Sequence, residues 1–300
     1  MCSNRRRVAR GWWPAALIAL SGFAFAVLPA PPFSQGLLFR VEAPGRPPSF
    51  VYGTLHSNDS RVTAVPAVVT QALAASRYLA PEILVAQSGA PEFLEAAQFD
   101  DQRRLGDYFD AETVASIRTA LGDAAPPPEV FVRLKPWAVL LMLAQPQAPA
   151  GGATLDEVLV EAARRQRAHV IGLELPQEQV ASLDAIPTVS QVAIVRWLLA
   201  HREQLPAEHE AAVRAWLARD LAGLATLTGA PGRADPDVAQ HFAQLTRHLV
   251  ENRSVLMAHR LYLPLREGRV FVAVGALHLY GRHGLLELIR AQGYRIERVY

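Results

Sequence analysis

The sequence predicts an α/β fold: a single domain whose central sheet is built near the two ends of the chain, with a mostly helical middle. Short apolar segments bounded by Gly, Pro and polar residues predict the strands. They lie at residues 36–42, 48–53, 78–85, 169–174, 269–274 and 294–299. Apolar residues at helical spacing fill most of the chain between the third and the fifth segment. No linker is long enough to force two domains, so we expect one domain over residues 31–300.

The predicted helices are recognised by apolar spacing and by the residues that begin them. Apolar positions at helical spacing predict a helix within residues 65–77, and residues 91–145 are expected to be mostly helical. Residues 145–152, rich in Pro, Gly and Ala, are expected to be a linker. Expected helix starts are two capping boxes, Thr154–Glu157 and Thr188–Gln191, and an N-cap followed by a first-turn proline, Asp235–Pro236.

The first thirty residues have the three-part layout of a secretory signal peptide. A basic head precedes an uncharged, mainly apolar run of 17 residues, and the small-residue stretches Ala24–Ala26 and Leu28–Ala30 follow. Cleavage after Ala26 or Ala30 would place the mature protein in the periplasm or outside the cell. The alternative is an uncleaved N-terminal anchor, because 17 residues are at the lower limit of a membrane span. The domain would then be membrane-anchored and face the periplasm.

The charge of the chain changes when this segment is removed. Residues 1–30 contain four Arg and no acidic residue, so the formal charge falls from +2 to −2 without them. A mildly acidic mature chain gives no reason to expect a nucleic-acid partner. The single cysteine, Cys2, lies in the same segment, which excludes a disulfide scaffold and leaves the mature chain without a thiol nucleophile.

One pattern occurs near both ends of the chain: a strand, Gly-x-Leu-His, a helix and a second strand. The first copy contains Gly53 and His56, and the second contains Gly275 and His278. In each copy the apolar strand stops at Gly, which permits a turn or a close backbone approach. Ligands of α/β sheets gather at the carboxyl ends of strands. We therefore expect a pseudo-symmetric core in which the two strand ends, with their histidines, lie side by side.

Two imidazoles and a nearby carboxylate are a set that holds a divalent transition metal with positions left open for water. Such a metal lowers the pKa of water and polarises a carbonyl group. The structural alternative is that each His simply ends a strand as a hydrogen-bonded residue. Two copies in matching contexts give the functional interpretation the same weight as that alternative.

These motifs resemble those of the TraB/GumN family, which includes the TIKI proteases of animal signalling. The segments Tyr52–His56 and Val272–Gly281 look like the two G-x-x-H motifs of the family, and Gly284–Tyr294 is similar to its C-terminal helix and strand. Two interior stretches also match: Gly172-Leu173-Glu174 with Glu178-Gln179, and Glu251-Asn252-Arg253. The resemblance covers roughly residues 37–300. It implies a domain distantly like that of the erythromycin-esterase-type hydrolases.

What the resemblance implies about the site is a metal-dependent peptidase. It assigns His56, His278 and Glu82 to a divalent cation (Mn, Co or Zn), Glu82 and Glu174 to catalysis, and Gly53, Gly275, Asn252 and Arg253 to the site lining. Glu174 is the candidate general base or a further ligand. The chain departs from the family at Glu251, where the Arg of an Arg-Asn pair is expected. Arg253, on the other side of Asn252, is the candidate substitute.

Both acids also have a structural interpretation. Glu82 interrupts the apolar segment Leu79–Val85, where an unpaired charge is costly, and either a metal or an Arg partner would make it tolerable. Glu174 ends another apolar segment, and as an alternative it is an ordinary acid at the start of the next helix.

The sequence therefore leads to two hypotheses. The leading one is a secreted or periplasmic metal-dependent hydrolase that acts on peptide or protein substrates. The competing one is a non-catalytic cell-envelope protein, an accessory of export or polysaccharide assembly, in which the same residues form a polar hydrogen-bonded core. The membrane is a partner only if the N-terminal segment stays uncleaved.

Overall fold

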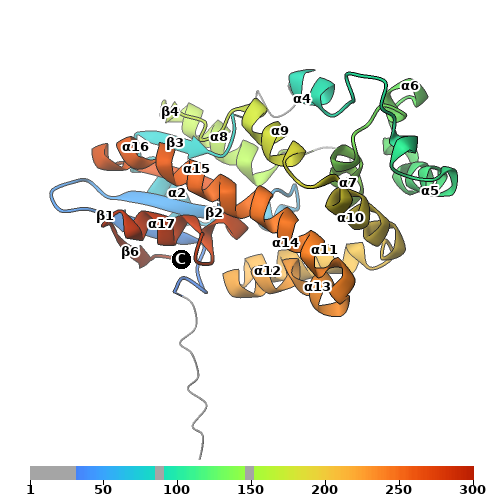
Figure 1. Cartoon of the computed structure of the whole chain (residues 1–300). Helices are drawn as coiled ribbons and strands as arrows, with labels where there is room; N and C mark the ends of the chain where they lie inside the picture. Colours follow the sequence, from blue (N-terminus) through green and yellow to red (C-terminus); the bar gives the residue numbers. More distant parts are fainter. Residues whose placement is uncertain (1–31, 85–90, 146–151) are drawn as a thin grey trace, which may run out of the picture. The chain divides into compact units, whose positions relative to one another are not determined.

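Six strands in the described part of the chain form one sheet (Figure 1). The structure is a computed structural model that describes residues 32–84, 91–145 and 152–300, and Pro31–Tyr300 forms one compact unit. The strands are β1 (Leu38–Glu42), β2 (Ser49–Thr54), β3 (Tyr78–Pro81), β4 (His169–Val170), β5 (Val270–Gly275) and β6 (Arg295–Arg298). Their order across the sheet is β4-β3-β5-β2-β1-β6. The α/β fold expected from the sequence is thus confirmed.

Strand direction places four carboxyl ends at one edge of the sheet. β2 pairs with β5 in parallel, β5 with β3, and β3 with β4, whereas β1 runs antiparallel to both β2 and β6. In the β2–β5 pair Gly53 lies opposite Val274, and Thr54 opposite Gly275. The two strands that lead into the histidine motifs therefore end side by side, as the sequence pattern predicts.

Helices make up most of the chain between β3 and β5. Between β3 and β4 they are α4 (Pro91–Ala96), α5 (Ala111–Leu121), α6 (Pro128–Phe131), α7 (Pro136–Ala144) and α8 (Leu155–Arg165), whereas α1 (Ser60–Thr63) and α2 (Ala67–Ala74) lie between β2 and β3. Between β4 and β5 they are α9 (Pro176–Asp184), α10 (Thr188–Ala200), α11 (Leu205–Leu217), α12 (Leu221–Thr228), α13 (Ala230–Ala234), α14 (Pro236–Thr246), α15 (Asn252–Arg260) and α16 (Tyr262–Glu267). α17 (Leu285–Ala291) precedes β6. Short 3-10 turns lie at Leu105–Asp107, Gly122–Ala124 and Ala276–Leu279.

The apolar residues form two separate cores. The first surrounds the sheet and includes Tyr52, Leu79, Phe271 and Val272, all fully buried. α15 and α17 lie in front of this sheet in the view of Figure 1, and α2 lies behind it. The second core contains no strand among its described residues, is built mainly from α5, α7 and α10 with residues of the segments between helices, and includes the fully buried Trp137. Burial of this kind stabilises a domain by about 25 cal/mol per Å² of apolar surface.

Three helix starts test the capping rules. Thr154 caps α8 in a true capping box, because its hydroxyl accepts the Glu157 N–H while Glu157 accepts the Thr154 N–H. Asp235 caps α14 through the Asp237 N–H. A helix also begins at Thr188, as predicted, but the capping box expected at Thr188–Gln191 is wrong, because α10 begins after Pro187 without a side-chain cap. There the Gln191 side chain donates to the Ile186 carbonyl instead.

The long helix expected after Asp235 is present, with an inserted π turn. α14 passes into a π-helical segment, Arg247–Glu251, and continues as α15. Single π turns occur frequently at functional sites, because the extra residue rotates the side chains that follow. Here the segment directly precedes Asn252 and Arg253.

Two expected strands end earlier than the sequence suggests. β3 stops at Pro81, so Glu82 follows the strand rather than interrupting it. Regular pairing of β4 covers only His169–Val170, although backbone hydrogen bonds continue along β3 as far as the Glu174 N–H, which donates to the Glu82 carbonyl. Proline has no N–H to donate to the sheet, which fits a strand that ends at Pro81. Glu82 and Glu174 therefore lie side by side, each at the end of one of two adjacent extended segments.

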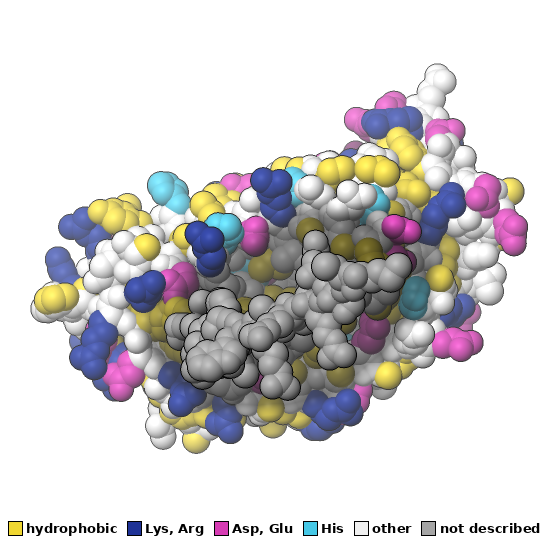
Figure 2. Space-filling view, turned by 60° about the horizontal axis from the view of Figure 1, so that its bottom comes forward, with side chains coloured by type: hydrophobic (Ala, Val, Ile, Leu, Met, Phe, Trp, Pro, Cys, Tyr) yellow, Lys and Arg dark blue, Asp and Glu magenta, His cyan; other side chains and the backbone are white. Residues whose placement is uncertain are grey.

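Some sequence predictions fall outside the described residues: the signal segment 1–30, Val85 and the linker residues 146–151. In the described ranges no single helix is both long and apolar enough to cross a membrane; α9 and α10, bent by 87°, pass that test only as a pair. On the face in Figure 2, basic and acidic side chains are interspersed among the described residues.

Candidate functional site

The candidate residues gather at the carboxyl edge of the sheet, where each follows a different strand. His56 follows β2, Glu82 follows β3, and His278 lies in the 3-10 turn after β5. Glu174 ends the extended segment that begins with β4. The sheet thus unites four residues that span more than two hundred positions in the sequence.

Arg253 of α15 joins the two carboxylates. Its Nη2 donates to Glu82 Oε2 at 2.8 Å and to Glu174 Oε2 at 2.6 Å, and its Nε donates to Glu174 Oε1 at 2.9 Å. The Glu174 side chain has no exposed surface, and that of Arg253 is 13% exposed. Two carboxylates this close repel each other, and the guanidinium between them compensates that charge. The Arg partner expected under the structural interpretation of Glu82 is thus present, and the same Arg253 also binds Glu174.

Glu82 remains ionised in this setting. Burial by itself would raise its pKa, but the positive charge of Arg253 and the hydrogen bonds from Arg253 and the Gly275 N–H oppose that effect and hold the pKa below its ordinary value. The Gly275 N–H donates to Glu82 Oε1 at 2.5 Å. Arg253 and Gly275 thus each bind one oxygen of the Glu82 carboxylate.

His278 is buried, and its hydrogen bonds define which nitrogen carries the proton. The Ser254 hydroxyl donates to the Val250 carbonyl at 2.8 Å, so its oxygen is left to accept from His278 Nδ1, 3.0 Å away. Burial lowers the pKa of His278, against the opposing effect of Glu82, which keeps the ring neutral. Nε2 therefore carries a lone pair. The Nε2 atom lies 3.6 Å from Glu82 Oε1.

His56 is held in the same way but lies exposed. Its Nδ1 donates to Asp156 Oδ2 at 3.3 Å, and the other Asp156 oxygen accepts from the Thr54 hydroxyl at 2.8 Å. The hydrogen bond to Asp156 raises the pKa of His56, with burial opposing. Because an ionised carboxylate only accepts, the neutral ring again has its lone pair on Nε2. The side chain is 74% exposed.

The remaining predicted residues separate into lining and packing roles. Gly275 lines the cavity, and a Cβ there would lie 3.1 Å from Glu82 Oε1. Gly53 serves packing instead, because a Cβ there would come within 2.8 Å of Leu279 Cδ1 and 3.1 Å of the Ala276 backbone. Asn252 is exposed and does not line the cavity. Arg253 does line it.

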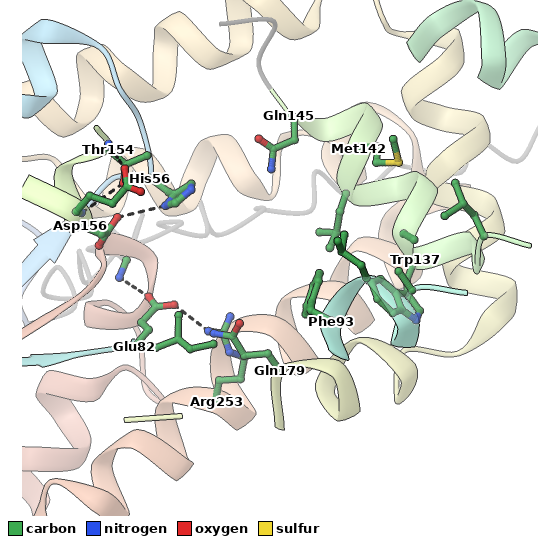
Figure 3. Close-up of a pocket in the computed structure, with 18 of the residues that line it drawn as sticks. His56, Glu82, Phe93, Trp137, Met142, Gln145, Thr154, Asp156, Gln179 and Arg253 are labelled. Atoms are coloured by element: carbon green, nitrogen blue, oxygen red, sulfur yellow. Dashed lines mark hydrogen bonds and ion pairs between the residues drawn. The ribbon is translucent and has the colours of Figure 1, made fainter. Parts of the chain in front are cut away.

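A cavity of about 960 Å³ opens beside these groups. Figure 3 shows its two ends, with His56, Asp156, Glu82 and Arg253 at one and Phe93, Trp137 and Met142 at the other. The polar end belongs to the edge of the sheet and the apolar end to α4 and α7. A largely apolar pocket with a few convergent polar groups is the usual form of a ligand site.

Sequence reasoning did not find Asp156, Ser254 or the apolar wall around Trp137. Asp156 stands inside the capping box of α8, where an acid is explained by the helix N-terminus alone. Ser254 directly follows Arg253, but a serine within a helix gives no signal of its own. The apolar wall belongs to the second core, and only the fold brings it to the histidines.

The potential metal ligands form a pair and a separate third residue. His278 and Glu82 face each other, whereas His56 lies on the wall of the same cavity beyond ion-pair distance of Glu82. In residues 32–84, 91–145 and 152–300, no three His, Cys, Asp or Glu side chains already lie close enough to share one ion. Both histidines nevertheless have Nδ1 held by an oxygen of the chain and Nε2 free to bind.

The fold and the site define an α/β protein with two histidines and paired carboxylates at the carboxyl edge of its sheet. A family model described as the TraB/PrgY/gumN family matches residues 37–298. The chain therefore belongs to this family, as the paired G-x-x-H motifs indicated.

Two bacterial relatives extend the comparison without assigning a reaction. The chain is similar to the uncharacterized protein YbaP of Shigella flexneri and to the uncharacterized protein YbaP of Escherichia coli K12. Each is 24% identical over 255 residues, which cover 83% of this chain and 90% of the relative. No solved structure matches the chain significantly.

Proposed function

We propose that this protein is a metal-dependent hydrolase that cleaves peptide bonds, exported by its N-terminal segment. The observation that carries the proposal is the pair formed by His278 Nε2 and Glu82 Oε1, 3.6 Å apart. One atom has a lone pair that faces outward from a neutral ring, and the other belongs to an ionised carboxylate. Two acceptors that face each other at this distance are unfavourable unless a proton or a metal cation lies between them, and the lowered pKa of His278 favours the metal cation.

The donor set fits a divalent metal ion. Bonds from zinc to nitrogen and oxygen are about 2.0–2.2 Å long, so two ligand atoms 3.6 Å apart can bind the same ion. Imidazole and carboxylate ligands suit Zn, Mn or Co. His278 and Glu82 would hold the ion, and His56, exposed on the same wall, would supply the third group. Bound there, the metal would polarise the scissile carbonyl and increase the acidity of a water molecule.

Residues of the chain position these groups. Ser254 fixes the ring of His278, and Asp156 fixes the ring of His56, in the arrangement in which an outer oxygen orients a metal-binding imidazole. The Gly275 N–H and Arg253 hold the two oxygens of Glu82. Arg253 also places a positive charge on the cavity wall, where it stabilises the negative charge that develops on the carbonyl oxygen.

Glu174 does not have the geometry of a general base. Its side chain has no exposed surface and both of its oxygens accept from Arg253. A general base must reach the proton that it removes. We assign Glu174 the task of anchoring Arg253, and Gln179 assists by donating to Glu174 Oε2 at 3.3 Å.

The cavity favours a peptide over a polysaccharide. Its far end is apolar, formed by side chains such as Phe93, Leu134 and Trp137. Sugar hydroxyls buried there would lack hydrogen-bond partners, which is costly, whereas apolar side chains of a peptide would gain from burial. This contrast favours peptide hydrolysis over an accessory role in polysaccharide assembly.

The experiment pairs elemental analysis with hydrolysis of a peptide library by the purified protein. We expect one Zn, Mn or Co per chain, and hydrolysis that stops with a chelator and returns when metal is added. His278→Ala should lose both. His283→Ala is the matched control, because His283 is 58% exposed and outside the cavity, and it should keep both. A protein with no metal, and with the same melting temperature with and without chelator, would favour the non-catalytic hypothesis.

A further inference from the structure

Two cavities meet at the proposed catalytic residues. A second cavity of about 350 Å³ lies beside the large one. Four residues line both: Thr54, His56, Glu82 and Gly275. The reacting groups therefore stand between two spaces, with room for substrate on each side, rather than at the closed end of a single pocket.

The two cavities differ in chemistry. The large one ends in the apolar wall of α4 and α7, where Phe93 and Trp137 pack edge to face with ring centres 5.8 Å apart. The small one lies against α11 and α12, and its walls include Ala212 and Leu227. The large cavity accommodates a bulky apolar side chain, and the small one accommodates a narrower group.

Glu208 contributes an unpaired carboxylate to the small cavity. It is exposed on α11, and no residue in the described ranges lies within hydrogen-bond or ion-pair distance of its side chain. Glu210, two residues further along α11, is instead bound by Arg61 Nη2 at 2.8 Å. A free carboxylate beside a narrow cavity attracts a cationic group. A Lys or Arg side chain of a substrate has both the slender stem and the charge that this cavity suits.

We infer that a peptide substrate crosses the site, with a bulky apolar side chain in the large cavity and a Lys or Arg side chain in the small one. An internal peptide bond is then placed at His56, Glu82 and His278. Hydrolysis adds the hydroxyl of water to the carbonyl carbon and its remaining hydrogen to the nitrogen, and the C–N bond breaks. The products are two shorter peptides, one with a new carboxylate and one with a new amine. This inference rests on the proposed hydrolytic function.

The test uses internally quenched peptides that are acetylated at the N-terminus and amidated at the C-terminus. Each has Trp or Ala on one side of a central bond and Lys, norleucine or Glu on the other, in both orders. We expect cleavage at the internal bond, fastest for the peptide with Trp and Lys, with kcat/KM at least tenfold lower when Glu replaces Lys. High salt should weaken the preference for Lys, because the contact at Glu208 is exposed.

Two variants assign each preference to its cavity. Glu208→Lys should abolish the preference for Lys over norleucine, and Glu203→Lys should keep it, since Glu203 is also exposed but lines neither cavity. Leu141→Trp narrows the large cavity and should reduce the preference for Trp over Ala while the preference for Lys stays. If Leu141→Trp does not fold, a charged substitution at the same position, Leu141→Asp, provides the same comparison.

A binding measurement separates the two proposals. Fluorescence anisotropy of the labelled Trp-Lys peptide is measured with chelator-treated protein, and we expect binding that Glu208→Lys weakens about fivefold. Such binding without metal-dependent cleavage would overturn the hydrolytic function, but it would support the inference that a peptide binds across both cavities. Cleavage without any preference at either position, or cleavage only of peptides with free ends, would overturn the inference that a peptide crosses the site. The proposed hydrolytic function would still hold.

Discussion

The two G-x-x-H segments have the same sequence pattern and opposite environments. In the first, His56 is exposed, and its Nδ1 donates to the carboxylate of Asp156 in α8. In the second, His278 is buried, and its Nδ1 is held by the Ser254 hydroxyl of α15. The two glycines differ as well: Gly53 permits close packing, whereas the Gly275 N–H binds Glu82.

This difference indicates that the two copies of the motif have different roles in the site. The buried copy forms a rigid half-site, since His278, Glu82, Glu174 and Arg253 are linked by direct contacts. The exposed copy presents a ring that a single hydrogen bond to Asp156 holds, and its exposed side leaves room to move toward the buried half-site. A site with one fixed and one adjustable side can admit a substrate before all ligand groups come together.

The largest effect on the free energy of unfolding should follow from removing the charge of Arg253 from the buried half-site. Arg253→Met leaves Glu82 and Glu174 facing each other without a cation, so we expect a loss of about 3–5 kcal/mol in the free energy of unfolding, measured in urea. Arg165→Gln removes an exposed pair with Glu161 instead and should cost less than about 0.5 kcal/mol. A loss below about 1 kcal/mol in Arg253→Met would show that the buried carboxylates do not need Arg253.

The two histidines should differ in what they contribute to the fold. Without added metal, His278→Ala opens a hole in a buried, hydrogen-bonded position and should cost about 2 kcal/mol or more in the free energy of unfolding. His56→Ala should stay within about 0.5 kcal/mol of the parent, because its ring faces solvent. Thermal and urea unfolding of both variants measure the difference. Equal losses would remove the contrast between a rigid and an adjustable half.

The side-chain oxygens of Asp156 and Ser254, which accept from the Nδ1 atoms of His56 and His278, should affect metal affinity. Asp156→Asn weakens the hold on His56, and Ser254→Ala removes the acceptor behind His278. We expect each to weaken metal binding about 10–100-fold, in calorimetric titration with Zn or Mn. Glu161→Gln, on the exposed face of the same helix as Asp156, is the control and should bind as the parent does. Unchanged affinity in both variants would mean that neither ring is a ligand.

The smallest effects should come from the two glycines, and they should be opposite in kind. Gly53→Ala forces a Cβ against Leu279 and the Ala276 backbone, so it should lower the free energy of unfolding by about 1 kcal/mol or more. Gly275→Ala has more room and should lose less stability, but its Cβ presses on Glu82 and should reduce metal affinity. If both variants lose stability alike and bind metal alike, the division of roles between the glycines is wrong.

Much of the fold was predictable from local patterns. The strands before Gly53 and Gly275, the cap at Thr154 and the helix after Asp235 follow from residue type and spacing alone. The failed cap at Thr188 shows the limit of such rules. There Ser190 contacts His241 Nδ1 of α14 at 3.0 Å, a tertiary contact that no local pattern contains.

The site was predictable only in part, for a physical reason. His56, His278, Glu82 and Arg253 stand out because a polar residue beside an apolar strand, or in a matched motif, needs an explanation. Asp156 and Ser254 are ordinary residues of helices, and their partners lie on other elements of the chain. Glu174 looked like a catalytic acid until the fold showed that Arg253 binds both of its oxygens.

The most direct test of the central claim is the metal content of the purified protein, measured by elemental analysis after dialysis against Zn, Mn and Co. The parent protein and His283→Ala should each retain one ion per chain, while His278→Ala and Glu82→Gln should retain none. A parent protein that retains no ion, or a His278→Ala variant that retains as much as the parent, would contradict the assignment of His278 and Glu82 to a metal site.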